Sequence, residues 1–514
     1  MPLRAQGQRL SRGIPAQRAG NAAPVELDGR GLTALALERA ARGGAPVRLS
    51  AAAVARVVGA HEALHRLVAA GTPIYGVTTG VGALDRDRSA PVSEHDRQVA
   101  LLRSHAAGVG PAMSDEAVRA MMVARANTLA RGMSGVSPGA LGALLALLAR
   151  GVTPLVPELG SVGASDLAPL AHMALVLIGE GRARLDGDEL PAAVALARAG
   201  LEPVRLAGRD GLALINGLAQ SAALAALAAV DAATLVETAE AAAAMSLCAL
   251  GAPRDFLDAR LGEAKRHGGQ DASARAMRDL LGGSISHSRR AESSAGSLRA
   301  PLSARYAPQV NGAARSALAF ATTAIEAELD AVADNPLIFA DGSLSSNSAT
   351  TGGQELAQAL DLLAISITSV AVASERRTAA LLDGSALPLA LRHPCARAGV
   401  DSGLLIAQYT AAALVAELRA RGGAASLHSI PTCPGEDHVS MSALAARQAG
   451  FAVDRARTVV AIEVLCACQA VDLAGVELAP PLAALHARVR ERVPVLVEDR
   501  VLGDDIAAAL AAIA

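Results

Sequence analysis

Long alanine-rich stretches in the second half of the chain limit its fold more than any other feature. Their apolar residues recur three and four positions apart, which is the spacing of one helix face. The predicted long helices cover residues 212–251, 308–334, 353–382, 401–421 and 438–473. Helices that pack through alanine approach closely and run side by side in bundles. The sequence therefore predicts an all-α fold built on a long central helical bundle.

The first half predicts a smaller, mostly helical domain that carries Gly-rich loops. Segments such as SDEAVRAMMVARANTLARG keep the helical spacing and end on Gly, and Ser50 and Ser114 are predicted N-caps. We expect three parts: a disordered basic tail at 1–25, an N-terminal active-site-loop domain at 26–208, and a bundle and oligomerisation domain at 209–514. The tail has four arginines, no acid and no apolar segment, so it does not have the pattern of a secretory signal.

Charge and composition argue against several classes of partner. The net charge is −2, which gives no electrostatic basis for binding nucleic acid or a membrane surface. The most apolar stretch, 212–250, contains Asn, Gln, Asp and Glu, so a buried helix explains it better than a membrane span. The five cysteines form no CxxC pair, which predicts a reduced, cytoplasmic protein without a metal site. The long helices have more apolar surface than a single chain can bury. We therefore expect an obligate oligomer.

Four polar, Gly-rich loops interrupt the apolar helices. IYGVTTGVG carries Tyr75, whose phenol could act as an acid or a base. In GSVGASDLAPLAH, Ser165 and Asp166 also fit an ordinary helix start, with Ser165 as the cap and Asp166 in the first turn.

The two remaining loops leave similar alternatives open. INGLAQ places Asn216 at the head of an apolar helix, where its amide is either a structural hydrogen-bonding group or a substrate ligand. HSIPTCPGEDHVSM places Glu436 next to Asp437 and His438, a run that also fits a solvated helix start.

Nine blocks of sequence together resemble the histidine and aromatic amino-acid ammonia-lyase superfamily, from about Val25 to the C-terminus. They are YGVTTGVG, LLRSHAAGVG, GSVGASDLAPLAHMALVLIGEG, GRDGLALINGLAQ, RYAPQVNG, ELDAVADNPL, SERR, DSGLLIAQYTAAALVAE and HSIPTCPGEDHVSM. The resemblance implies an all-helical homotetramer, active sites that are each built from three chains, and a small amino-acid-like substrate.

The resemblance also implies a prosthetic group made from the backbone itself. Such enzymes form a methylidene-imidazolone from an Ala-Ser-Gly tripeptide, whose Gly nitrogen attacks the Ala carbonyl with loss of two waters. This chain has Ala164, Ser165 and Asp166 there, and its loop is one residue shorter. Asp166 adds a Cβ to a compressed turn and brings a carboxylate toward the carbonyl under attack. We therefore expect no ring and no cofactor.

Other positions of the family's site are carried over residue by residue. The expected catalytic set is Tyr75, Ala164, Ser165, Asp166 and Glu436, and the expected substrate-binding set is Ser104, His105, Asn216, Arg305 and Thr351. Arg305 would grip a carboxylate through two hydrogen bonds. The pair Ser104 and His105 resembles the histidine-type selectivity pair, although a His satisfied inside a packed helix fits as well. Leu302 replaces a Tyr that serves such enzymes as a base.

These features predict an enzyme, a carbon–nitrogen lyase of the ammonia-lyase type. The main prediction is a divergent elimination from a histidine-like or other polar amino acid, without the electrophile and with a leaving group better than ammonia. One alternative is a conventional ring-containing histidine or aromatic amino-acid ammonia-lyase, or an aminomutase. Another is a catalytically silent homologue that binds a ligand or assembles with an active partner.

Overall fold

The computed structural model describes residues 23–87, 92–282, 300–432 and 435–513. The predicted basic tail lies outside these residues up to position 22. The helices are α1 (Ala34–Ala41), α2 (Ala51–Ala69), α3 (Glu94–His105), α4 (Asp115–Ala130), α5 (Pro138–Arg150), α6 (Leu167–Leu177), α7 (Ala192–Arg198), α8 (Asp210–Ile215), α9 (Ala219–Leu250), α10 (Ala259–Lys265), α11 (Gly268–Leu280), α13 (Leu302–Arg305), α14 (Ala307–Leu329), α15 (Gln354–Leu382), α16 (Leu405–Ala420), α17 (Ser442–Ala474), α18 (Pro480–Arg490) and α19 (Leu502–Ile513).

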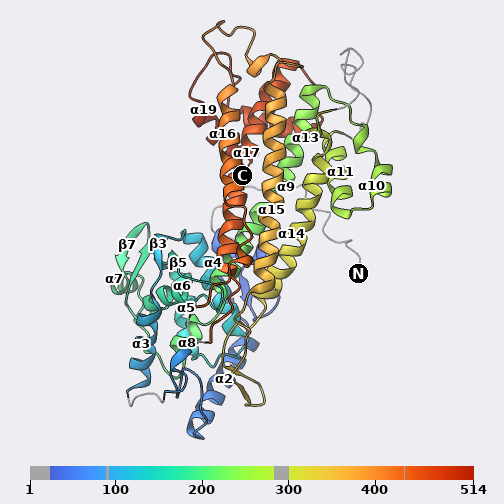
Figure 1. The fold of residues 1–514 in the computed structure, drawn as a ribbon. Helices are drawn as coiled ribbons and strands as arrows, with labels where there is room; N and C mark the ends of the chain where they lie inside the picture. The colour runs from blue at the N-terminus through green and yellow to red at the C-terminus, as the bar shows by residue number, and fades with distance from the viewer. Residues whose placement is uncertain (1–22, 88–91, 283–299, 433–434, 514) are drawn as a thin grey trace.

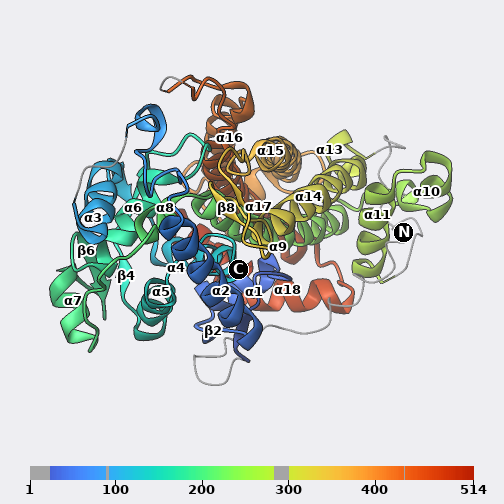
Figure 2. The ribbon, with the colours of Figure 1, turned by 90° about the horizontal axis from the view of Figure 1, so that it is seen from below.

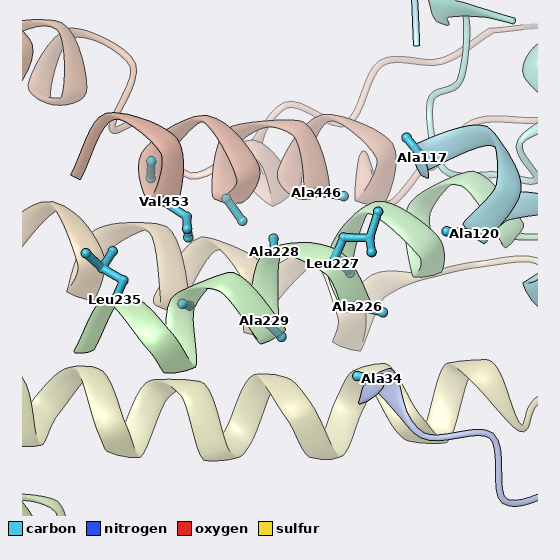
Figure 3. Packing of buried hydrophobic residues seen from close by; sticks show 14 of the residues in the cluster. Ala34, Ala117, Ala120, Ala226, Leu227, Ala228, Ala229, Leu235, Ala446 and Val453 are labelled. Atoms are coloured by element: carbon cyan, nitrogen blue, oxygen red, sulfur yellow. The ribbon is translucent and has the colours of Figure 1, made fainter. Parts of the chain in front are cut away.

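A bundle of long helices forms the body of the molecule, as the alanine-rich stretches predicted (Figure 1). Helix α17 packs against both α15 and α9, and α14 packs against α9 and α15. Figure 3 shows why these helices lie so close: Ala228 and Ala229 of α9 lie between neighbouring helices, and Ala446 of α17 lies across from them. Alanine side chains let the helix axes approach closely. The all-α prediction is confirmed.

The shorter helices α3, α5, α6 and α8 lie at one end of this bundle (Figure 1). Figure 2 shows α3 and α7 at one edge of the molecule and α10 and α11 at the other. The predicted N-caps are confirmed: Ser50 Oγ accepts from Ala53 N at 3.0 Å, and Ser114 Oγ accepts from Ala117 N at 3.3 Å.

Short strands connect these helices. Strands β1 (Val25–Leu27) and β2 (Val47–Leu49) pair in parallel, with Val25 opposite Val47. The antiparallel groups are β3 (Val109–Ala112) with β5 (Pro157–Leu159); β4 (Thr153–Pro154), β6 (Arg182–Leu185) and β7 (Asp188–Pro191); and β8 (Leu337–Ile338) with β9 (Leu344–Ser345).

Two of the expected helices differ from their predicted ranges in ways that shape the site. The expected helix 212–251 breaks after α8, because Asn216 has a non-helical ψ of 93°, and it resumes as α9. Gly217, in the break, lies so close to the guanidinium of Arg125 that an added Cβ would clash with it. The expected helix 438–473 begins only at Ser442, since Met441 has a φ of 58° and its N–H donates to Val162 O at 2.8 Å.

Within the part of the chain that the structure describes, two stretches are long and apolar enough to cross a membrane. The most apolar window of Asp210–Leu250 is 89% buried inside the fold, as expected of a core helix. The corresponding window of Gln354–Leu382 is 56% buried, so part of α15 presents apolar side chains at the surface of the single chain.

Candidate active site

Four loops meet where the long helices α9, α15 and α17 begin. Within the loop 160–166, Ala164 pairs with Gly352, Ser165 N–H donates to Thr351 O at 3.1 Å, and Asp166 N–H donates to Gly217 O at 2.7 Å. On the other side, Ser440 Oγ donates to Gly163 O at 2.6 Å. The structure therefore brings residues 160–166, 216–221, 350–353 and 440–442 into one place, which we call the loop junction.

Ser165 lies at the centre of the loop junction in a left-handed backbone conformation. Its φ is 65°, only 4% of the residue is exposed, and its hydroxyl donates to the side-chain carbonyl of Asn216. A non-glycine residue with positive φ is uncommon and is found often at functional sites. The reading of Ser165 as a helix cap is wrong, because the N-cap residue of α6 is Asp166.

Asp166 is fully buried, and its carboxylate faces α9. Ser161 Oγ donates to Oδ1 at 2.5 Å, Ser221 Oγ donates to Oδ1 at 3.0 Å, and Ser221 N donates to Oδ2 at 2.8 Å. Burial raises the pKa of Asp166, while these hydrogen bonds oppose the shift. The carboxylate was expected to lie near the Ala164 carbonyl. The structure binds it to Ser161 and to Ser221 in the first turn of α9.

Asn216 is held by charged groups that the sequence analysis missed. Its Nδ2 donates to Asp334 Oδ1 at 3.1 Å and to Asn335 O at 2.9 Å. Asp334 in turn accepts two hydrogen bonds from Arg209, Nη1 to Oδ2 at 3.1 Å and Nη2 to Oδ1 at 2.9 Å. Both charged residues are fully buried. Because the amide nitrogen is occupied in this way, the carbonyl of Asn216 is oriented toward Ser165.

A second buried arginine adds positive charge near the loop junction. Arg125 Nη2 lies 3.8 Å from Asp334 Oδ2, and the guanidinium also donates to Ala213 O. Burial lowers the pKa of Arg125 to about 10, which leaves it charged at neutral pH. Arg125, Arg209 and Asp334 stand in the sequence as charged residues within apolar segments, which could have marked them as buried charges. Their pairing could not be predicted, because Arg209 and Asp334 are more than 100 residues apart in the chain.

Thr351 is tied to the loop junction through its backbone, whereas Tyr75 is held within its own loop. Thr351 contributes the carbonyl that accepts from Ser165 N–H. Tyr75 is half-buried, and its Oη accepts from Gly82 N at 2.7 Å. The next residue, Gly76, packs closely against Leu212 of α8.

Ser104 and His105 end helix α3. Ser104 Oγ donates to Leu101 O at 2.9 Å and lies 3.0 Å from His105 Nδ1. His105 Nδ1 lies 2.9 Å from the same Leu101 carbonyl. A carbonyl oxygen only accepts, so Nδ1 carries the proton and Nε2 is the ring nitrogen available to a ligand. The structure is compatible with both predicted roles of this pair. The Leu101 carbonyl accepts hydrogen bonds from Ser104 Oγ and His105 Nδ1, while His105 Nε2 can contact a substrate.

Arg305 is not brought to the loop junction within a single chain. Arg305 ends α13, whose Ser303 O accepts from Arg377 Nη1 at 3.1 Å. Arg377 lies 23 residues along α15 from Gln354, or about 35 Å at a helix rise of about 1.5 Å per residue. Figure 1 shows α13 near the opposite end of the bundle from α6. Glu436 is exposed, and its backbone carbonyl accepts from Thr432 N at 3.0 Å.

The residues at the loop junction fit a backbone-derived ring at two of its three positions. Ala164 supplies the carbonyl, and Ser165 supplies a buried hydroxyl that Asn216 already binds. The third position departs from the family, because the nitrogen belongs to Asp166 and its N–H now donates to Gly217 O. Ring closure through this nitrogen would leave the Asp166 side chain outside the ring, where Ser161 and Ser221 hold it.

Comparison with known proteins gives consistent results. The family model for aromatic amino acid lyases matches residues 32–491. The chain is 44% identical over 494 residues to a histidine ammonia-lyase from Symbiobacterium thermophilum, covering 94% of this chain and 95% of the relative. The crystal structure of histidine ammonia-lyase from Trypanosoma cruzi superposes with a TM-score of 0.87 at 35% identity, covering 95% and 92% of the two chains. Tyrosine aminomutase from Streptomyces globisporus gives a TM-score of 0.90 at 36% identity, covering 96% and 97%.

These relatives overturn two of the predictions. The main functional prediction, a divergent elimination without the electrophile, is wrong, because relatives more than 40% identical over nearly the whole chain are histidine ammonia-lyases. The prediction of no cofactor is wrong for the same reason, since that family makes its prosthetic group from its own backbone. Both predictions rested on the missing Gly, on the shorter loop and on the Asp166 carboxylate, which the structure binds to Ser161 and Ser221. The prediction of a carbon–nitrogen lyase is confirmed.

Proposed function

The chain belongs to the aromatic amino acid lyase family, and we propose that within it this protein is a histidine ammonia-lyase that eliminates ammonia from histidine. The observation that carries the proposal is the Ala164–Ser165 pair, whose buried Ser165 hydroxyl is bound by Asn216 at the start of three long helices. The identity of 44% to a histidine ammonia-lyase supports histidine as the substrate.

The prosthetic group would be held by Ala164, Ser165 and Asp166. When formed, it supplies an electron-poor carbon that makes the substrate amine a better leaving group. Asn216 binds the Ser165 hydroxyl, and Arg209 with Asp334 fixes which side of the Asn216 amide faces Ser165. Burial excludes water from this part of the site, which strengthens each of these polar contacts.

The remaining roles are assigned to side chains in the surrounding loops. The phenol of Tyr75 is the proposed base that removes the Cβ proton, since Leu302 provides no titratable group. The Nε2 atom of His105 is the proposed contact for the substrate imidazole, with Ser104 next to it. Thr351 and Glu436 complete the proposed site, with Thr351 holding the loop of Ser165 and Glu436 entering from an exposed loop.

We propose a homotetramer in which sites are shared between chains. Arg305, the proposed ligand of the substrate carboxylate, lies far from Ser165 within one chain and would come from another copy. Its buried Nε has no hydrogen-bond partner among the described residues. Exposed apolar side chains of the bundle also favour such assembly. They include Phe320, Leu362, Ile365, Leu405, Ile406 and Tyr409. The free Cys248, Cys395, Cys466 and Cys468 support a cytoplasmic location.

An assay of substrate range tests the proposal. The purified full chain is incubated with histidine, tyrosine and phenylalanine in separate reactions, and ammonia and the α,β-unsaturated acid are quantified. We expect both products in equal amounts from histidine, and a kcat/KM for histidine at least about 10-fold above that for the aromatic amino acids. A higher kcat/KM for tyrosine, or a β-amino acid as the main product, would contradict the proposal.

A further inference from the structure

Two histidines one helical turn apart on α2 face each other, outside the set of residues that form the loop junction. The segment reads HEALH, and the Nε2 atoms of His61 and His65 lie 3.1 Å apart. Their rings are perpendicular, with centroids 4.5 Å apart. Residues at i and i+4 share one face of a helix, so α2 itself sets this separation. His61 is half-buried and His65 is exposed, which leaves the pair accessible from solvent in the single chain.

The tautomer of His61 is fixed by the neighbouring loop. Its Nδ1 lies 3.2 Å from the carbonyl oxygen of Gly135, between α4 and α5. A carbonyl only accepts, so Nδ1 carries the proton and Nε2 presents a lone pair toward His65. A backbone carbonyl that binds the other ring nitrogen is also the usual partner of a metal-ligating histidine, because it fixes ring orientation and raises ligand basicity.

From this geometry we propose that His61 and His65 form a binding site for a divalent transition-metal ion of the zinc type. Two imidazole nitrogens that bind one tetrahedral Zn²⁺ at about 2.0–2.1 Å lie about 3.3 Å apart, close to the separation seen here. Imidazole ligands favour Zn²⁺, Cu²⁺ and Ni²⁺ over Mg²⁺ or Ca²⁺. The site is independent of the proposed lyase activity.

Water completes the coordination, because no third His, Cys, Asp or Glu joins the pair among the residues that the structure describes. The Asp210 carboxylate has other partners: its oxygens accept from Ser137 N at 2.7 Å, Ser137 Oγ at 2.8 Å and Ala207 N at 2.9 Å. Glu62 extends from the same helix toward Arg66, 4.0 Å away. With two protein ligands the site binds a metal ion reversibly.

The competing explanation is a simple hydrogen bond in which His65 Nε2–H donates to His61 Nε2. Calorimetric titration of the metal-stripped full chain with ZnCl₂ separates the two, using wild type, H61Q and H65Q. The matched control is H267Q, which changes an exposed histidine elsewhere on the chain. We expect H61Q and H65Q each to weaken the affinity for one zinc equivalent by about 10-fold or more, and H267Q to leave it unchanged.

Crystals of wild-type protein soaked in ZnCl₂ provide a readout without any substitution. We expect an anomalous peak at about 2.0–2.1 Å from both Nε2 atoms. An H65Q isotherm that matches wild type, or zinc peaks that all lie away from α2, would overturn the proposal and leave only the hydrogen bond.

Discussion

The hydroxyl of Ser165 donates to the side-chain carbonyl of Asn216, and the same Asn216 donates its amide to the carboxylate of Asp334. One buried amide thus links the proposed source of the prosthetic group to an ion pair with Arg209. Since both ends of the amide are occupied, Asn216 cannot flip without losing both contacts.

Replacing Asn216 should remove activity and lower stability together. N216A leaves the Ser165 hydroxyl and one Asp334 oxygen without this partner, which costs about 1–3 kcal/mol in the free energy of unfolding. We expect histidine turnover to fall by about 100-fold or more, since the loop of Ser165 loses its orientation. The matched control is Q469L, which removes another buried amide that donates to Leu496 O at 2.9 Å, far from the site. Denaturant unfolding and steady-state kinetics measure both effects, and equal loss of turnover in Q469L would contradict a specific role for Asn216.

The ion pair of Asp334 with Arg209 should be far more costly to break than a surface pair. D334N leaves two buried guanidinium groups without their counter-charge, so we expect a loss of about 3–5 kcal/mol in the free energy of unfolding. The control E189Q removes an exposed partner of Arg184 and should change stability by less than about 1 kcal/mol. Urea unfolding of both variants gives the comparison. If D334N were as stable as E189Q, the prediction would be wrong, and the charges of Arg209 and Asp334 would have to be solvated rather than buried.

Glu328 should make stability depend on pH. Burial, with Asp166 as a second cause, raises the pKa of Glu328 from 4.5 to about 7 in the folded chain. The folded state therefore binds a proton more tightly than the unfolded state, so this contribution to stability is complete below pH 4.5 and is lost as pH rises through about 7. Relative to E328Q, wild type should lose about 1–3 kcal/mol over that window, measured by urea unfolding at several pH values. E355Q, at an exposed carboxylate of α15, is the control, and a constant difference between wild type and E328Q would contradict the prediction.

Sharing of sites between chains predicts complementation. S165A lacks the residue needed at the loop junction, and R305A lacks the proposed carboxylate ligand, so each variant alone should be inactive. Coexpressed chains should form mixed oligomers in which some sites take intact Ser165 from one chain and intact Arg305 from another. We expect partial recovery of histidine turnover in such oligomers, isolated through two different affinity tags. Inactive mixed oligomers would mean that both residues must belong to the same chain.

The sequence predicted the bundle well because alanine spacing is a local signal. The helices 353–382 and 308–334 lie close to their predicted positions as α15 and α14. The breaks at Asn216 and Met441 were missed, because each exists to satisfy a contact with a distant loop. The division into domains at residue 208 stays a prediction.

Within the site, the motifs identified Ser165, Asn216 and Thr351, which the structure does bring together. They could not show where the Asp166 carboxylate points, since Ser221 lies in a separate segment, on the next long helix. The expectation of no ring rested on the missing Gly, the shorter loop and a carboxylate assumed to lie near the Ala164 carbonyl. The motif also marks Arg305 as a substrate ligand. It could not show that Arg305 and Ser165 lie near opposite ends of α15 within one chain.

The mass of the loop peptide tests the central claim most directly. The purified full chain is digested, and the peptide that spans residues 160–172 is compared with the same peptide from S165A, which cannot dehydrate at that position. A conventional histidine ammonia-lyase predicts a wild-type peptide lighter by two waters and an S165A peptide that keeps its full calculated mass. A wild-type peptide of full calculated mass, from protein that still binds histidine, would contradict the account and show that Ala164, Ser165 and Asp166 keep ordinary peptide bonds.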